Sequence, residues 1–352
     1  METTGKVLFI GGSGIVGSRA VKRFRERHAD TPILIGGRDM RKANAIAHEV
    51  GNADAVQVDI DKPGLGLSKN IPLAAVVMLA PDGGLHGLSL AQAQRVPYLS
   101  IGNWLVEVGA EMAHFMRHPK ASAIVLASHW HGGTSVFLTQ ATIKGMDKVQ
   151  SVKIGAIVDE HDITGPAALA DMARGADSGG TLAFEDARRV WLSGASSKRV
   201  IKAIDGREID AMTLAPYDVV SLHALTGAPH IRFDFASAIS SSRSRGDDIA
   251  TELVVEIDGE VGGKPQTRRS TLEFKRGQAT LTAMSVVLLL STILGEDGGP
   301  PLPPGLYFPE HILGTEWFLS ELIREGATVV TDEGRYIDAI NDSLRADQVA
   351  ST

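Results

Sequence analysis

The sequence predicts an α/β fold, in which a doubly wound parallel sheet is joined to a second, strand-rich α+β domain. Short apolar runs alternate with helix-like segments over residues 1–132, a pattern typical of a parallel sheet with helices on both faces. A glycine-rich turn joins the first apolar run to the first helix-like segment. After about Gly145 longer β-like stretches replace this alternation, which indicates a second domain in a chain of 352 residues.

The predicted elements follow from the spacing of apolar residues. In the first part the expected strands are 7–10, 33–35, 55–58, 74–79, 98–101 and 123–126, and the expected helices are 17–27, 40–50 and 88–95. In the second part we expect strands at 151–159, 199–204, 230–236, 251–257 and 269–274, and helices at 182–192 and 277–294. The proline-rich stretch 298–305 predicts a stiff linker, followed by a helix at 317–325 and a strand at 328–331.

Composition excludes several classes of function. The net charge of −7 argues against nucleic acid as a partner, since nucleic-acid-binding proteins usually carry a basic excess. The chain has no cysteine, which excludes disulfides, thiolate metal sites and cysteine nucleophiles. Neither a basic leader nor an apolar run of ~20 residues is present, so we expect no membrane partner and a cytoplasmic location.

The loop Gly12-Ser13-Gly14-Ile15-Val16-Gly17 follows the first expected strand and opens the first expected helix. This is the context that a Gly-x-Gly-x-x-Gly motif needs to bind a dinucleotide. Gly12 suits a tight turn, Gly14 lets a pyrophosphate approach the backbone, and Gly17 lets the helix pack closely on the strand. The helix N-terminus adds N–H groups and a partial positive charge. All six residues are therefore predicted to hold the pyrophosphate of a dinucleotide cofactor.

The end of the second strand distinguishes two cofactors. A site for NAD usually has Asp or Glu about 20 residues past the glycine loop. This chain has Arg38 and Asp39 there, with Arg41 and Lys42 one turn later. Because arginine can bind a 2′-phosphate through two parallel hydrogen bonds, we predict NADP(H) in preference to NAD(H). The alternative is that Arg38 is a solvated turn residue and Asp39 binds the ribose of NAD.

Further cofactor contacts are expected at the carboxyl ends of the next strands, where sheets of this kind bind ligands. Asp59 and Ile60 follow the third strand, where the adenine ring would lie. Ala80 and Pro81 follow the fourth strand and would border the nicotinamide ribose. Ser100 ends the fifth strand and completes this predicted set.

His129 and His131 are the predicted catalytic residues. They flank Trp130 after the sixth strand, at the expected domain junction. Histidine titrates near neutral pH, so either side chain could act as a general acid toward a hydride acceptor. The alternative is that Trp130 packs in a hinge and both histidines are solvated. No third ligand is evident beside them, so we predict no metal site.

The predicted substrate-binding residues are Asn103, Trp130, Ser178, Gly180 and Thr181. The last three precede the expected helix 182–192, whose exposed N–H groups could hold a substrate carboxylate. The alternative is ordinary helix capping by Ser178 or Thr181.

The chain as a whole resembles the saccharopine dehydrogenase/saccharopine reductase-like oxidoreductases. The resemblance rests on five stretches: 7–17, 37–39 with Lys42, 58–60, Pro216-Tyr217 through 227–229, and 304–310. Two positions depart from the pattern of that family. His131 stands where relatives have the proline of a Gly-x-x-Pro-Gly turn, and Ser100 stands where many relatives have an aspartate.

The resemblance implies a Rossmann domain over 1–132 that is completed by 300–352, and an inserted α+β domain over 133–299 for substrate binding and dimerisation. It also implies hydride transfer between NADP(H) and an imine, a secondary amine or a related carbonyl compound. The expected partners are a small-molecule substrate, with a carboxylate as one candidate group, and a second copy of the chain. Two alternatives stay open, namely a non-catalytic NADPH-binding sensor or scaffold, and a reductase of C=C bonds.

Overall fold

The computed structural model describes residues 5–68, 71–102, 104–166, 169, 180–332 and 334–336. The chain divides into two compact units. The first comprises Met1–Gly132, Thr164–Met172 and Thr282–Leu313, and the second comprises Gly133–Ile163, Ala173–Leu281 and Gly314–Thr352. The domain limits inferred from the sequence remain a prediction, and the segment 300–352 contributes strands to both sheets.

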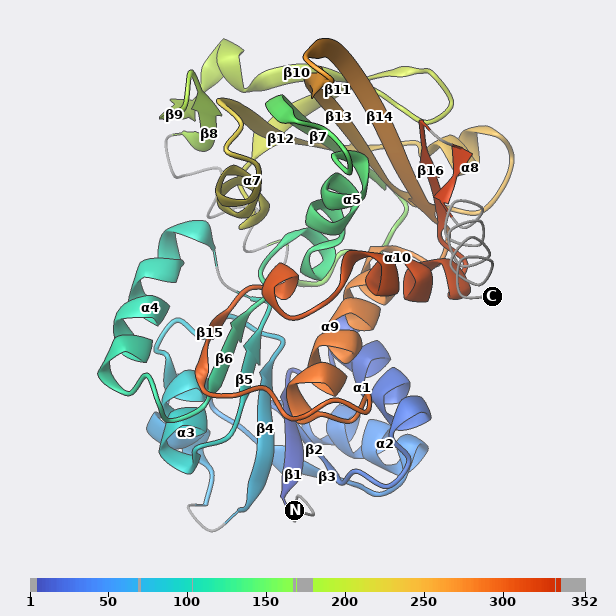
Figure 1. Cartoon of the computed structure of the whole chain (residues 1–352). Helices are drawn as coiled ribbons and strands as arrows, with labels where there is room; N and C mark the ends of the chain where they lie inside the picture. Colours follow the sequence, from blue (N-terminus) through green and yellow to red (C-terminus); the bar gives the residue numbers. More distant parts are fainter. Residues whose placement is uncertain are drawn as a thin grey trace, which may run out of the picture. The chain divides into compact units, whose positions relative to one another are not determined.

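Seven parallel strands form the sheet of the first unit, in the order β15-β6-β5-β4-β1-β2-β3 (Figure 1). They are β1 (Lys6–Ile10), β2 (Ile33–Gly37), β3 (Ala53–Gln57), β4 (Leu73–Met78), β5 (Tyr98–Ser100), β6 (Ala123–Leu126) and β15 (Gly305–Tyr307). Six of them follow the strand order 3-2-1-4-5-6 of a Rossmann fold, and β15 extends the sheet beyond β6. The predicted fold class is confirmed. The order reverses between β1 and β4, and sheets of this kind usually bind ligands at the carboxyl ends of the strands beside such a reversal.

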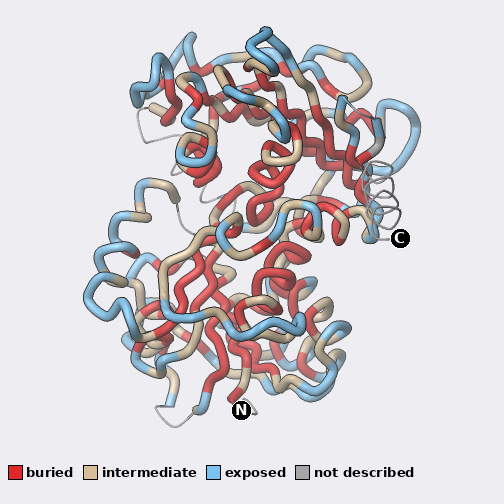
Figure 2. The backbone as a smooth tube through the Cα atoms, in the orientation of Figure 1, coloured by how far each residue is buried: buried red, intermediate tan, exposed pale blue. Residues whose placement is uncertain are grey.

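Helices cover both faces of this sheet, so its inner strands are almost wholly buried, whereas the edge strands β3 and β15 are only partly buried (Figure 2). Figure 1 shows α1 (Ile15–Arg27), α2 (Met40–Val50) and α9 (Gln278–Leu294) on one side, and α3 (His86–Gln94) and α4 (Val108–Arg117) on the other. Helix α1 buries Gly17, Ala20, Val21 and Phe24, which recur at helical spacing. This packing fixes the start of α1 against the end of β1.

A mixed sheet forms the core of the second unit, in the order β10-β11-β12-β7-β13-β14-β16-β17, with β8 and β9 attached beside β12. The strands are β7 (Lys148–Asp159), β8 (Thr181–Glu185), β9 (Arg188–Leu192), β10 (Lys198–Lys202), β11 (Glu208–Leu214), β12 (His230–Ala238), β13 (Thr251–Val261), β14 (Lys264–Phe274), β16 (Thr328–Thr331) and β17 (Gly334–Arg335). Helix α5 (Thr134–Thr142) packs on β13 and β14, and α7 (Asp218–Thr226) packs on β12. Helix α10 (Thr315–Arg324) packs on α5 through stacked rings of Phe137 and Phe318.

The predicted helix over 182–192 is wrong, because this segment forms the antiparallel hairpin β8–β9. Asp186 and Ala187 make the turn with φ angles of 48° and 60°. Two successive positive φ angles are typical of a two-residue type I′ hairpin turn, which usually contains Asn or Gly. The segment has neither residue at its turn, so its sequence lacks the usual hairpin signal. Strand β11 and helices α4 and α7 were also missed by the sequence analysis.

Ala187 carries a strained backbone that glycine would relieve. We expect Ala187→Gly to raise the free energy of unfolding of the second unit by about 0.5–1 kcal/mol, because an L-residue in the left-handed region costs roughly 1–2 kcal/mol and glycine loses more chain entropy on folding. Urea unfolding followed by circular dichroism measures the change. The control Ala195→Gly, at a residue without a positive φ, should lower or leave the stability. A loss of stability in Ala187→Gly would contradict the strain.

Candidate functional site

The glycine loop lies at the carboxyl end of β1, where it turns into α1. Gly11 adopts a φ of 79°, and its amide donates to the carbonyl of Gly36 in β2 at 2.9 Å. Gly14 is the N-cap of α1 and provides no side-chain hydrogen bond to the first turn. The first N–H groups of a helix have no intrahelical acceptors, so this terminus is suited to bind an anion.

Three glycines of the loop differ in the space around them. A Cβ atom at Gly17 would lie 2.1 Å from the carbonyl oxygen of Gly11 and 2.7 Å from the Cα of Gly12. At Gly12 it would lie 3.0 Å from Phe9. At Gly14, which is exposed, it would meet only the carbonyl oxygen of Gly11, at 3.1 Å. The loop therefore needs glycine for packing at Gly17 and presents open backbone at Gly14, which is the arrangement that a pyrophosphate requires.

Arg38 and Asp39 follow β2 and begin α2. Asp39 is the N-cap of α2, and its Oδ1 accepts hydrogen bonds from the amides of Arg41 at 3.0 Å and Lys42 at 3.3 Å. The Arg38 side chain is exposed and has no ion pair or hydrogen bond with any described residue. One oxygen of Asp39 is thus occupied in capping, whereas the guanidinium of Arg38 is available to a ligand.

The predicted residues after β3 and β4 lie on turns at the same edge of the sheet. Asp59 forms an ion pair with Lys62 and accepts a hydrogen bond from the amide of Asp61, and these two donors lower the pKa of its carboxyl group. Ile60 is partly buried beside it. Ala80 and Pro81 are also partly buried, and the amide of Leu79 donates to the carbonyl of Ile10 at the end of β1.

A buried network, which was not predicted from the sequence, joins the loop after β4 to the start of α3 and the start of β5. The carboxylate of Asp82 accepts hydrogen bonds from the Tyr98 hydroxyl at 3.0 Å and from the amides of Gly87 and Leu88 at the start of α3. Burial, with Asp82 and Glu111 nearby, raises the pKa of Tyr98 well above its usual value. A carboxylate that caps a helix from the preceding loop fixes both segments. The sequence did contain an indication of this network, because Asp82 stands four residues before α3 and a carboxylate there can cap the helix.

Ser100 is fully buried, and its hydroxyl donates to Glu111 of α4 at 3.4 Å. Its side chain therefore bonds within the protein in this structure. Just beyond it, Gly102 approaches the loop after β4, since a Cβ there would lie 2.7 Å from the carbonyl carbon of Ala80. The turns that follow β4 and β5 are thus packed against each other.

The two predicted catalytic histidines are buried. Burial lowers the pKa of His131 to about 3, and burial together with His311 lowers the pKa of His129 to about 3. The Nε2 of His129 lies 3.8 Å from Glu310, and Trp130 lies against His131 with ring centroids 4.8 Å apart. Both imidazoles are therefore neutral at pH 7, and neither carries the extra proton of an imidazolium. The solvated histidines considered as the alternative are not found.

The predicted substrate residues fall in different places. Gly180 and Thr181 lie at the start of β8, so the helix N-terminus that was to make them an anion site does not exist. Asn103 and Ser178 lie outside the described residues. Trp130 lies after β6, half-buried beside His131. A substrate carboxylate therefore cannot be bound at Gly180 and Thr181 by the N–H groups of a helix N-terminus.

Two further properties concern metals and membranes. Among residues with described positions, no group of three or more His, Asp or Glu side chains has a geometry that could hold a metal ion. In the same part of the chain, no helix has both the length and the apolar character needed to cross a bilayer.

Comparison with known proteins identifies relatives in structure but not in sequence. No family model matches the chain, and no curated protein matches its sequence. The apo saccharopine dehydrogenase (L-Glu forming) of Saccharomyces cerevisiae superposes with a TM-score of 0.68 at 13% identity, over 93% of this chain and 99% of that one. A scyllo-inositol dehydrogenase from Lactobacillus casei matches with a TM-score of 0.49 at 11% identity, over 93% and 98%. An engineered D-amino acid dehydrogenase gives 0.48 at 12%, over 92% and 100%. The first match shows that the chain has the fold of saccharopine dehydrogenase, as the sequence resemblance indicated.

The buried histidines predict a loss of stability in acid. A histidine whose pKa is about 3 when folded and about 6.5 when unfolded stabilises the folded state above pH 6.5, and this stability is lost as the pH falls toward 3. The loss is about 1.4 kcal/mol per pH unit for each histidine within that window. We expect His129→Gln and His131→Gln to reduce the drop in urea midpoint between pH 7 and pH 5. The exposed His48→Gln should leave the drop unchanged, and an equal effect in all three would contradict the assignment.

Tyr98→Phe tests the buried network. Removing the hydroxyl leaves Asp82 with one donor fewer in a buried site, which should lower the free energy of unfolding by about 1–3 kcal/mol. Amide hydrogen exchange at Gly87 and Leu88 should become faster, because the carboxylate that they bond is no longer fixed by Tyr98. The control Tyr307→Phe removes an exposed hydroxyl that bonds Pro303, and it should change stability by less than about 0.5 kcal/mol. Equal effects of the two variants would contradict the role given to Asp82.

Proposed function

We propose that this protein is an NADP(H)-dependent oxidoreductase that transfers a hydride to an imine, or from a secondary amine, or to a related carbonyl compound. The observation that carries the proposal is the glycine loop at the end of β1, open at Gly14 and closely packed at Gly17, in a sheet whose strand order reverses beside it. The fold shared with saccharopine dehydrogenase supports the oxidoreductase class.

The residues present fit a dinucleotide. The backbone of residues 12–17 would bind the pyrophosphate, since no side chain fills the space at Gly14 and the start of α1 has no side-chain cap. The turn at Asp59 and Ile60 would border the adenine, and Ala80 with Pro81 would border the nicotinamide ribose. When bound, the nicotinamide supplies or accepts the hydride. The chain's own residues bind and orient the cofactor, and the network at Asp82 holds the loop that carries Ala80.

The preference for NADP(H) rests on Arg38. Its guanidinium is exposed at the end of β2 and engages no described partner, so it can bind a 2′-phosphate with paired hydrogen bonds. Asp39, the candidate ligand for a bare ribose, uses one oxygen to cap α2. The substrate is proposed to be a small molecule, with a carboxylate as a candidate recognition group, and the protein is proposed to act as a homodimer.

A second candidate is a non-catalytic NADPH-binding sensor. The low pKa of His129 and His131 favours it, because neither side chain is an imidazolium that could act as a general acid at pH 7. Turnover of NADPH with any pair from a panel of amines and keto acids would rule it out. With deuterated NADPH, the position of deuterium in the product, located by mass spectrometry, separates imine reduction from reduction of a C=C bond.

Arg38→Ser tests the cofactor assignment. In titrations followed by nicotinamide fluorescence, we expect the wild type to bind NADPH more tightly than NADH. The variant should weaken NADPH binding by roughly 10- to 100-fold, the equivalent of about 1.5–3 kcal/mol for hydrogen bonds to a charged group, and leave NADH binding nearly unchanged. The control Lys120→Ser removes an exposed charge elsewhere and should alter neither. Binding of neither cofactor to the wild type would refute the function, whereas tighter NADH binding would refute only the role of Arg38.

A further inference from the structure

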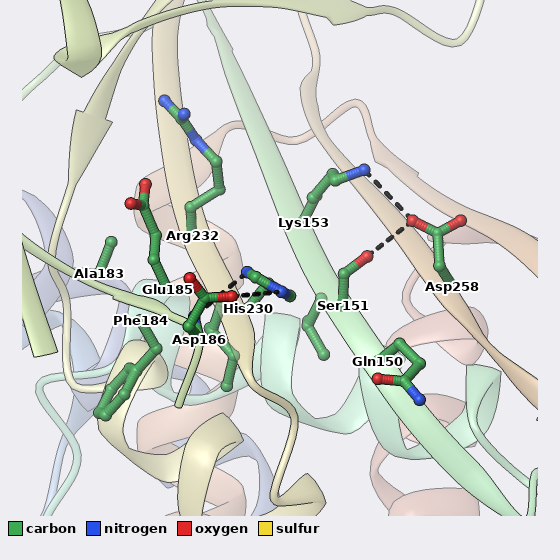
Figure 3. A pocket seen from close by; sticks show the side chains of 12 residues that line it. Gln150, Ser151, Lys153, Ala183, Phe184, Glu185, Asp186, His230, Arg232 and Asp258 are labelled. Atoms are coloured by element: carbon green, nitrogen blue, oxygen red, sulfur yellow. Dashed lines mark hydrogen bonds and ion pairs between the residues drawn. The ribbon is translucent and has the colours of Figure 1, made fainter. Parts of the chain in front are cut away.

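A pocket of about 480 Å³ lies within the second unit, on one face of its sheet (Figure 3). Strands β7, β12 and β13 provide its floor, and the β8–β9 hairpin provides one wall. Its volume falls in the range of small-molecule sites. None of the residues that line it is a predicted site residue, and the proposed cofactor site lies in the other unit.

Two cations stand next to each other on the floor. Arg232 of β12 and Lys153 of β7 are direct partners in the parallel strand pair, so their side chains share one face of the sheet. Like charges placed opposite each other on neighbouring strands destabilise a sheet. Each is offset by a carboxylate. Lys153 is bonded to Asp258 at 3.2 Å, and Arg232 is bonded at 2.6 and 2.9 Å to Asp234, which also pairs with Arg199 at 3.1 Å.

These ion pairs fix the cations without using all of their donors. The Nε and Nη2 of Arg232 bond Asp234 and Thr213, whereas no bond joins its Nη1 to any described residue. The ammonium of Lys153 has three donors, of which one goes to Asp258, and 42% of the side chain is exposed. Asp258 is itself held by Ser151 at 2.7 Å. The floor therefore presents two positioned cations with donors left for an anionic group.

The wall that the β8–β9 hairpin forms is acidic. Glu185 and Asp186 come from the β8–β9 hairpin, and Figure 3 shows them on one side of the pocket, with Lys153 and Asp258 on the other. Glu185 is exposed and has no hydrogen bond or ion pair with any described residue. Asp186 lies 3.6 Å from the Nε2 of His230. The two carboxylates could accept hydrogen bonds from an ammonium group.

We propose that this pocket binds a small zwitterion, with its carboxylate between Lys153 and Arg232 and its ammonium at Glu185 and Asp186. A simple anion would face the three lining acids Glu185, Asp186 and Asp258, and a simple cation would face the two fixed bases. A molecule that carries both charges, as a free amino acid does, meets an opposite charge at each end. The site is separate from the proposed cofactor site and does not depend on the proposed function.

Binding of defined probes to the full chain tests the proposal. Saturation-transfer NMR titrations with β-alanine, 4-aminobutanoate and 6-aminohexanoate measure affinity against the distance between the two charges. Butanoate and butylammonium serve as half-ligands that carry one charge each. We expect saturable binding of at least one zwitterion with a dissociation constant on the order of 1 mM, as suits partly exposed ion pairs, and at least about fivefold tighter than either half-ligand. Zwitterions that bind no more tightly than the half-ligands would overturn the proposal.

Paired variants locate the binding. Lys153→Met and Glu185→Gln should each weaken binding of the tightest zwitterion by at least about fivefold. Glu185 is exposed and unpaired among the described residues, so the Glu185→Gln variant should fold. Lys148→Met and Glu208→Gln remove matched exposed charges from strands of the same sheet and should have no effect. Equal weakening by the control variants would mean non-specific charge effects and would refute the site. NADPH binding should be the same in all four, so a failure here is distinct from a failure of the proposed function.

Discussion

The close approach of α1 to β1 is the contact on which the proposed site depends. A Cβ atom at Gly17 would lie only 2.1 Å from the carbonyl oxygen of Gly11, which is too close for any side chain. Only glycine therefore lets the helix begin this near to the strand. That proximity points the first turn of α1 at the carboxyl edge of the sheet, beside the reversal of strand order between β1 and β4. A side chain at Gly17 would move the helix and with it the N–H groups that are proposed to bind pyrophosphate.

Much of the first unit could be predicted from the sequence because its signals are local. Helix α2 begins and ends at the predicted residues, since Asp39 caps it and apolar residues recur at helical spacing up to Val50. Strand β6 also matches its predicted range. The glycine loop was recognisable because its spacing and its place between strand and helix are set by backbone geometry. By contrast, the sheet that strand 328–331 joins could not be predicted. A short apolar strand of four residues has no sequence feature that indicates its partner strand, which is β14.

What the sequence missed depends on contacts between distant segments. The hairpin β8–β9 forms because its two strands pair with each other and because β8 also pairs with β12. This pairing outweighs the helix propensity of residues such as Glu185 and Arg189. The burial of His129 and His131, and hence their low pKa, comes from surrounding chain that no local pattern reveals. Likewise Arg232 and Lys153 are 79 positions apart and become neighbours only through the register of β12 on β7.

The neutral histidines bear on which acceptor suits the proposed site. Hydride addition to a ketone produces an alkoxide, which needs a proton from a nearby acid. Hydride addition to an iminium ion produces a neutral amine and needs none. An imidazole with a pKa of about 3 is a poor acid at pH 7, because almost none of it is protonated. If His129 and His131 border the substrate, as the sequence predicts, their burial therefore favours a C=N acceptor over a C=O acceptor. In that case the neutral state of both imidazoles would also avoid placing positive charge beside a cationic acceptor.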